Sequence, residues 1–374
     1  MMYRFADIFS GGGGMSLGLL DAGLVDVIAG DFWDIAKKNY TSYHKLNESK
    51  FHQIDMYQKK DIELITKELL QSNIDLLVGG PPCQGFSTLG KREGEDTRNQ
   101  LVEAYLRLAM IVKPKMIIME NVPAIQSMKH SSGVKYPEYA KKFLSEHGYY
   151  AETIFVDGSQ VGLAQTRKRL FLIGINKEYV VNLENFSDLL NDTVKKLAPA
   201  DSYSTLRDVI YDLPRIEDGE GEDESLYSGK LIYNHNVFKY QTETLARIKV
   251  VPYGGGLQDI PDDLLSNHLI KMKSGGYGSG GFVKNLYGRL DWDKPSGTIV
   301  AGIKKITGGR FFHPENDRLL TVREAARLQS FPDDYKFLGS MTEQYTIVGN
   351  AVPPKFSKFI GKVLIEIFDK YKRG

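Results

Sequence analysis

Short apolar runs alternate with longer amphipathic stretches from Tyr3 to Ile175. This alternation predicts successive strands and helices, and therefore a mostly parallel sheet flanked by helices. The expected strands are Tyr3–Ile8, Val27–Gly30, Phe51–Ile54, Leu76–Val78, Met116–Met119, Ala151–Val156 and Leu170–Ile175. The expected helices are Met15–Ala22, Ile35–Tyr43, Asp61–Leu70, Leu101–Val112 and Tyr139–His147. The predicted fold class is therefore α/β, with a doubly wound sheet that binds ligands beyond the carboxyl ends of its strands.

The alternation ends near Tyr179, and the second half of the chain has no regular pattern. The acidic run from Ile216 to Glu224 predicts a solvated surface loop. From Ser225 to Arg310, by contrast, 12 Lys and Arg residues stand against 6 Asp and Glu residues, with aromatic residues among them. Such an excess of positive charge is either a solvated face or a patch that meets phosphates. The glycine-rich stretches 254–256 and 271–281 within it are expected to be loops.

The composition is that of an ordinary globular protein, with 374 residues of which 42% are apolar and 25% charged. We find neither the roughly 18 apolar residues of a membrane helix nor the apolar core of a signal peptide, and expect a cytoplasmic protein. The single cysteine, Cys83, permits no internal disulfide, and the seven histidines have no metal-ligand spacing, so no metal is expected. The net charge is only +1, so any nucleic acid must be met by a local patch.

A glycine-rich segment, Phe9–Gly14, follows the first expected strand and opens a helix. Its glycines let the backbone approach a ligand, and the amides at the helix start point toward it. The spacing of a dinucleotide-binding loop fails, because Ser16 or Leu17 occupies the place of the third glycine. Asp31 lies 20 residues beyond Gly11, where an acidic side chain meets a ribose. We therefore expect a ligand that carries a ribose and does not require a pyrophosphate.

Two residues after later strands complete this expected pocket. Asp55 could accept a hydrogen bond from an adenine amino group, and Phe32 could stack on the ring. The alternative interpretation is a tight turn with N-capping acidic residues, which bind backbone amides and no ligand.

Cys83 and Glu120 follow the fourth and fifth expected strands. In the usual strand order these strands lie beside the first, so the two side chains should flank each other next to the glycine-rich segment. A cysteine on a loop near helix-start amides is favoured as a reactive thiolate. Cys83 alone could equally be a buried packing residue, and the neighbouring Glu120 favours catalysis.

A thiolate, a carboxyl group and a ribose-bearing ligand together suit methylation of cytosine at carbon 5. This carbon is too electron-poor to attack a methyl donor until a nucleophile adds at carbon 6, and a thiolate can supply that addition. A carboxyl group such as Glu120 can donate or share a proton at ring nitrogen 3, a step typically worth ~10² to 10⁴ in rate.

Six motifs resemble those of the cytosine-5 DNA methyltransferases that use S-adenosylmethionine, of the prokaryotic restriction-modification type. They follow the family's order and span nearly the whole chain: Asp7–Gly14, Pro81–Gln84, Glu120–Val122, Gln165–Arg169, Arg323–Gln329 with Phe331 and Pro332, and Gly349–Pro354.

The resemblance implies a role for each residue that matches a motif. Cys83 is the expected nucleophile and Glu120 the partner of cytosine nitrogen 3. Arg167 and Arg169 are the expected pair that fixes the catalytic loop and touches the flipped base. The expected S-adenosylmethionine pocket comprises Phe9, Gly11, Gly13, Asp31, Phe32, Asp55, Met56, Pro82, Leu101, Asn350 and Val352. Three departures from the family pattern, Ala164, Asp31 and Ala351, affect only backbone stiffness and cofactor details.

The resemblance also implies a double-stranded DNA substrate with an extruded base. Residues 84–98 would form a lid over it, or else a plain loop. Residues 1–178 with 340–374 would form the catalytic domain, with helix Lys355–Phe368 packed back on it, and residues 179–339 a smaller, irregular target recognition domain. The expected DNA contacts are Ser87, Lys91, Arg92, Lys271, Lys273 and Tyr277. We expect a monomer that is cytoplasmic and nucleoid-associated. A cognate restriction endonuclease is a possible partner that would act separately, and the sequence does not reveal whether it exists.

Three rival functions remain at this point. The tRNA-methylating branch of the family carries a second cysteine motif, which this chain lacks. A catalytically idle DNA-binding protein would need neither Cys83 nor Glu120. A nicotinamide-dependent oxidoreductase does not match the glycine spacing.

Overall fold

The computed structural model describes residues 2–82, 99–275, 283 and 285–373. The chain forms two compact units, each assembled from separate segments. Unit 1 comprises Met1–Val161, Lys168–Asp201 and Val352–Gly374, and unit 2 comprises Gly162–Arg167 and Ser202–Ala351. These bounds differ from the expected domains, since the segment after Tyr179 continues in unit 1 as far as Asp201 and the expected return at residue 340 comes only at Val352.

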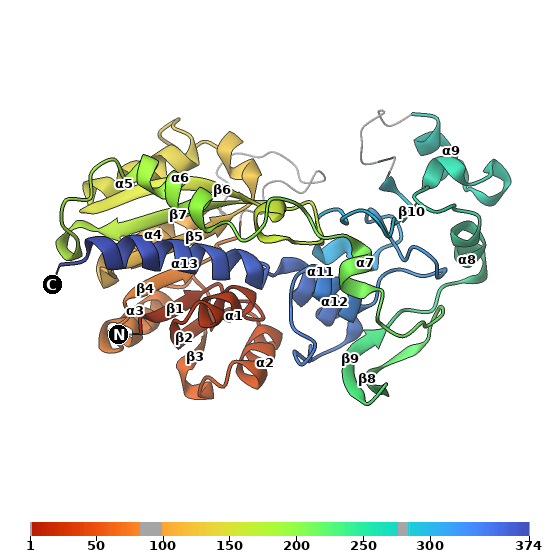
Figure 1. Cartoon of the computed structure of the whole chain (residues 1–374), viewed down its shortest axis with the longest axis horizontal. Coiled ribbons are helices and arrows are strands. Elements are labelled where there is room, and N and C mark those ends of the chain that lie inside the picture. Colours follow the sequence, from red (N-terminus) through yellow and green to blue (C-terminus); the bar gives the residue numbers. More distant parts are fainter. Residues whose placement is uncertain (1, 83–98, 276–282, 284, 374) are drawn as a thin grey trace. The chain divides into compact units, whose positions relative to one another are not determined.

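A seven-stranded sheet forms the centre of unit 1, in the order β3-β2-β1-β4-β5-β7-β6 (Figure 1). Strands β1 to β5 are parallel, and β7 runs antiparallel to both β5 and β6. The strands are β1 (Arg4–Ile8), β2 (Val25–Asp31), β3 (Phe51–Gln53), β4 (Leu76–Gly79), β5 (Met116–Asn121), β6 (Tyr149–Asp157) and β7 (Lys168–Asn176).

Helices cover this sheet and complete its core. They are α1 (Gly14–Asp21), α2 (Asp34–Tyr43), α3 (Lys59–Gln71), α4 (Asn99–Val112), α5 (Tyr136–Glu146), α6 (Phe186–Leu197) and α13 (Pro354–Tyr371). Helix α13 packs against α1 and α6, as expected for the last helix. The approach is close, since a Cβ added at Gly18 would lie 2.1 Å from the Pro354 carbonyl oxygen.

Every expected strand and helix of unit 1 is present, with ends that differ by at most three residues. The predicted doubly wound α/β fold is confirmed. The prediction succeeded because the parallel strands are buried on both faces and their apolar runs contrast with the amphipathic helices between them. Within the described residues, no helix is long and apolar enough to cross a membrane.

Unit 2 contains short elements and two small sheets, β8 with β9 and β10 with β11. Its elements are α7 (Leu206–Ile210), β8 (Gly221–Tyr227), β9 (Lys230–Asn236), α8 (Thr242–Lys249), α9 (Asn267–Lys273), β10 (Gly288–Arg289), β11 (Arg310–Phe312), α11 (Val322–Leu328) and α12 (Met341–Asn350).

Two loop predictions in unit 2 hold only in part. The acidic run continues into strand β8, which pairs with β9 across the turn at Ser228 and Gly229. Both turn residues have positive φ, 50° and 77°, as two-residue hairpins favour. The start of the expected 271–281 loop is the last turn of α9.

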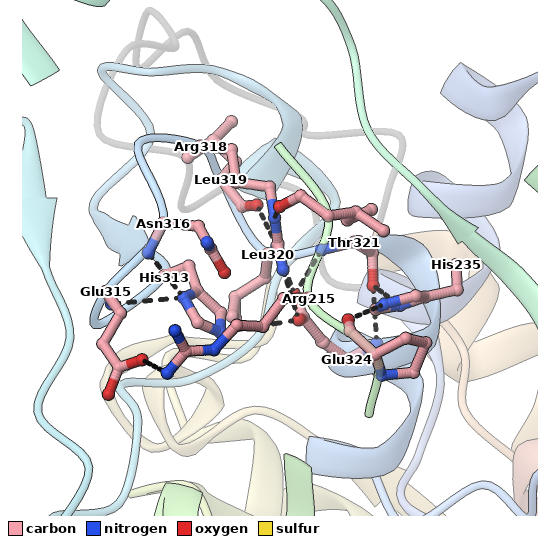
Figure 2. Close-up of polar contacts among 12 residues, drawn as sticks. Arg215, His235, His313, Glu315, Asn316, Arg318, Leu319, Leu320, Thr321 and Glu324 are labelled. Carbon is pink, nitrogen blue, oxygen red and sulfur yellow. Dashed lines mark hydrogen bonds and ion pairs between the residues drawn. The ribbon is translucent and has the colours of Figure 1, made fainter. Parts of the chain in front are cut away.

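A buried network of charged and polar groups stabilises unit 2 (Figure 2). Arg318 donates two hydrogen bonds of 2.8 Å to the Glu324 carboxylate, and both side chains are almost fully buried. His313 Nε2 lies 3.8 Å from Glu324, while its Nδ1 accepts hydrogen bonds from the Asn316 and Glu315 backbone amides. Burial lowers the pKa of His313 to about 4, so the ring stays neutral at physiological pH.

This network predicts an acid-labile unit 2. Below pH 6.5 the unfolded chain protonates its histidine while folded His313 does not, so stability falls as the pH falls toward 4, by about 3 kcal/mol for this group. We expect His313→Asn, whose amide oxygen can still accept from the backbone, to lose less stability between pH 7.5 and 4.5. Urea unfolding followed through Trp292 in a Trp33→Phe background measures this. Equal losses in both proteins would contradict the assignment.

Candidate active site

The segment after β1 forms a turn whose conformation depends on its glycines. Gly11 and Gly13 have φ of 53° and 82°, and Phe9 also has a positive φ, 66°. The amides of Phe9 and Ser10 donate to the Gly30 carbonyl at the end of β2, at 2.8 and 3.1 Å. A Cβ added at Gly11 would meet no described atom within 4 Å, so this side of the turn is open to a ligand.

Asp31 ends β2 and fastens this turn. Its Oδ2 accepts a 2.9 Å hydrogen bond from the Gly11 amide, and its Oδ1 accepts one of 3.0 Å from the Trp33 amide. Burial raises the pKa of Asp31, and these backbone hydrogen bonds oppose the shift. The structure thus gives Asp31 a structural role and leaves ribose binding as a prediction.

The other expected pocket residues of unit 1 differ in exposure. Phe32 is 67% exposed, as a side chain that awaits a stacking partner would be. Asp55 Oδ1 accepts from the Tyr57 amide at 2.9 Å, in line with the turn interpretation. Met56 and Leu101 are buried, and Pro82 and Val352 are partly buried. Asn350 lies in unit 2 and is exposed, so its expected role stays a prediction.

The carboxyl ends of β4 and β5 carry the expected catalytic groups. Glu120 Oε1 accepts from Arg169 Nε at 2.8 Å, and both side chains are about 90% buried. The other oxygen, Oε2, faces Gly80 and would lie 3.3 Å from a Cβ there. A buried ion pair of this kind fixes the orientation of the carboxylate.

Asn121 connects these two strand ends. Its Nδ2 donates a 3.0 Å hydrogen bond to the Pro81 carbonyl, two residues before the expected nucleophile. Cys83 itself lies outside the described residues. No separate role was predicted for Asn121, although it stands next to Glu120 in the same motif.

The two motif arginines have different surroundings. Arg169 on β7 pairs with Glu120, whereas Arg167 belongs to unit 2 and donates to the carbonyls of Ile299 and Ala351 at 2.8 and 3.0 Å. These contacts assign Arg167 to the support of the backbone in unit 2. Contact of either arginine with a base stays a prediction.

The Gln165 and Gln329 side chains support the same part of unit 2. Gln165 Nε2 donates to Gln329 Oε1 at 2.8 Å, and Gln329 Nε2 donates to the Val348 carbonyl at 2.7 Å. These two motif residues thus stabilise the interior of unit 2.

Several cations of unit 2 are bound within the protein. Arg289 is buried and donates to four backbone carbonyls and to Asp317. Arg310 donates to the carbonyls of Gly254 and Gly255, and Lys273 to Asp262. Of the expected DNA contacts, Lys271 is exposed and Lys273 is partly buried, while Ser87, Lys91, Arg92 and Tyr277 lie outside the described residues.

Comparison with known proteins identifies the family. The model of the C-5 cytosine-specific DNA methylase family matches residues 3–366. The chain belongs to this family. It is 30% identical to Type II methyltransferase M1.HphI of Haemophilus parahaemolyticus, over 98% of this chain and 88% of that one. It is 31% identical to Type II methyltransferase M.Sau96I of Staphylococcus aureus, over 99% of this chain and 77% of that one.

Solved structures support the fold of this cytosine-5 methyltransferase. A prophage-encoded methyltransferase structure from E. coli superposes with a TM-score of 0.71 at 24% identity, covering 98% of this chain and 99% of that one. The S. pombe Dnmt2 methyltransferase superposes with a TM-score of 0.64 at 18% identity, covering 98% and 99%. The predicted family, enzyme class and fold are confirmed, and the oxidoreductase alternative is wrong.

The Glu120–Arg169 pair predicts a large stability cost when one partner is lost. Arg169→Ala leaves a buried carboxylate without its cation and is expected to reduce the unfolding free energy by about 3–5 kcal/mol. The matched control is Lys168→Ala on the same strand, whose exposed pair with Asp157 is expected to contribute less than about 1 kcal/mol. Urea unfolding followed through Trp33 in a Trp292→Phe background measures both. Equal effects would show that the buried pair does not stabilise unit 1.

Proposed function

We propose that this cytosine-5 methyltransferase transfers a methyl group from S-adenosylmethionine to a flipped cytosine within a short, fixed sequence of duplex DNA, through a covalent adduct of Cys83. The observation that carries the proposal is the shared edge of the sheet, where the glycine turn, Asp31 and the Glu120–Arg169 pair meet the ends of neighbouring strands. Ligand sites of doubly wound sheets lie at this edge.

The residues of unit 1 fit the proposed cofactor. The open position at Gly11 leaves room for a ligand to lie directly against the backbone of the turn. The Asp31 carboxylate accepts a hydrogen bond from the Gly11 amide and therefore lies beside this space. Phe32 and Asp55 follow at the ends of β2 and β3, where an adenosine would extend. When bound, S-adenosylmethionine supplies an electrophilic methyl group. Further proposed pocket residues of unit 1 are Phe9, Gly11, Gly13, Met56, Pro82, Leu101 and Val352. The resemblance alone adds Asn350 of unit 2.

The chain supplies the remaining chemistry of the proposed reaction. The Cys83 thiolate adds to carbon 6 of the ring, and the electron pair moves toward nitrogen 3 and carbon 5. Glu120, held by Arg169, donates or shares a proton at nitrogen 3. After carbon 5 is methylated, its proton leaves to a base, the sulfur–carbon bond breaks, and the thiolate is restored. A closed, water-poor site protects the adduct.

The proposed biological role is based on the similarity to Type II methyltransferases. Type II methyltransferases act in restriction-modification, so we propose a separate cognate endonuclease, a monomeric methyltransferase and a place in the cytoplasm at the nucleoid. Exposed residues such as Lys271 would contact phosphates, which fix position and carry no base sequence.

Incubation with duplex DNA and methyl-labelled S-adenosylmethionine, followed by bisulfite sequencing, tests the proposal. We expect 5-methylcytosine in one short context, no product from Cys83→Ser, and a rate lower by about 10² to 10⁴ for Glu120→Gln. Duplex that contains 5-fluorocytosine should trap the wild-type protein covalently but not Cys83→Ser. Labelled N4-methylcytosine or N6-methyladenine would contradict the mechanism, because an exocyclic amine needs no thiol adduct.

A further inference from the structure

The glycine turn of unit 1 has an open position and a packed position. Gly11 faces open space among the described residues, but a Cβ added at Gly13 would lie 2.1 Å from His44 Nε2 and 2.9 Å from the Tyr40 ring. Two aromatic rings, of α2 and its C-cap residue, therefore pack against the turn at Gly13, whereas its Gly11 position is open.

His44 is held firmly in this place. It follows α2 as its C-cap, is 7% exposed, and stacks on Tyr40 with ring centroids 4.2 Å apart and an interplanar angle of 24°. Burial lowers the pKa of His44 to about 4, although hydrogen bonding with the backbone of Gly12 and Gly13 opposes this shift. At neutral pH an uncharged ring thus contacts the two glycines at the start of α1.

Hydrogen bonds connect the Tyr40 ring to β1, the strand that precedes the turn. Its hydroxyl donates to Ser16 Oγ at 2.8 Å, and Ser16 donates to Asp7 Oδ2 at 2.6 Å. All three side chains are fully buried. A continuous chain of contacts therefore runs from Asp7 on β1, through α1, to the ring pair behind Gly12 and Gly13.

We propose that His44 is a positioning residue that, stacked on Tyr40, holds the glycine turn in its ligand-binding conformation and thereby sets the affinity for the methyl donor. The inference rests on the proposed function, since it takes S-adenosylmethionine as the ligand of the open position. Preorganisation acts mainly on binding: a turn that must be ordered by the ligand binds it more weakly.

The test compares the wild-type full-length protein with His44→Ala and His44→Phe. Isothermal titration calorimetry with S-adenosylmethionine and S-adenosylhomocysteine is expected to give a Kd about tenfold higher for His44→Ala. Amide hydrogen exchange in the peptide that contains Gly11–Met15 should be faster in the free variant. At saturating donor, kcat for DNA methylation should stay within about twofold, and KM for DNA should not change.

His147→Ala is the matched control. His147 is also the C-cap of its helix, α5, and its ring centroid lies 4.4 Å from that of Phe143, four residues earlier. Unlike His44, however, His147 is exposed and does not pack against the glycine turn. Its loss should leave donor affinity and the exchange of the turn unchanged. If His44→Ala does not fold, His44→Phe decides: it keeps a ring but no nitrogen, and a severalfold weaker Kd is expected.

Donor affinity and turn exchange equal to wild type in a folded His44 variant would overturn the proposal. The same holds for an affinity loss that His147→Ala shares. Failure of the wild-type protein to bind either nucleoside would overturn the proposed function together with this inference, whereas normal wild-type binding with unaffected His44 variants would overturn the inference alone.

Discussion

The register of three neighbouring parallel strands determines where the chemistry of this enzyme lies. Ile8 on β1 pairs with Gly79 on β4, and Gly79 pairs with Met119 on β5. Because the strands are parallel and in step, the residues that follow each strand emerge at the same edge. The glycine turn, Pro81 and Glu120 are neighbours for this reason. A shift of one strand by a single residue would turn its side chains to the other face.

Around this edge, polar side chains hold the backbone and one another in place. Asp31 accepts from the Gly11 amide, Asn121 donates to the Pro81 carbonyl, and Arg169 orients Glu120. The first two contacts connect a strand end to an irregular segment, and the third connects β5 to β7. Such supporting contacts keep reactive groups in place without a cost in reorganisation during the reaction.

The sequence was informative where local pattern determines structure. The sheet of unit 1 could be predicted because each of its strands is a short apolar run, and the edge residues could be grouped because parallel topology brings them together. Strand β8 could not be predicted in this way, because its charged residues are exposed and lack the alternation of a half-buried strand.

The arginines of unit 2 show a second limit of sequence patterns. The charge count between Ser225 and Arg310 does not reveal that Arg289 is buried and hydrogen-bonded within the protein, as Arg318 is just beyond that stretch. Arg318 donates to the carbonyl of Ile216, 102 residues earlier in the chain. No local pattern reveals a partner at that separation, so the burial of a charged side chain had to come from the structure. Sequence patterns did indicate the glycine turn, Cys83 and Glu120, because each of them comes shortly after a predicted strand.

The packing of α13 on α1 has a consequence for biosynthesis. The first helix of the sheet unit finds its partner more than 330 residues later, after the whole of unit 2 has been translated. Until then the apolar surface of α1 that includes Leu19 lacks the cover that Gly361 and its neighbours provide. During synthesis this apolar surface therefore stays exposed until α13 has been translated. Exposed apolar surface of this kind is prone to aggregation and is commonly bound by chaperones.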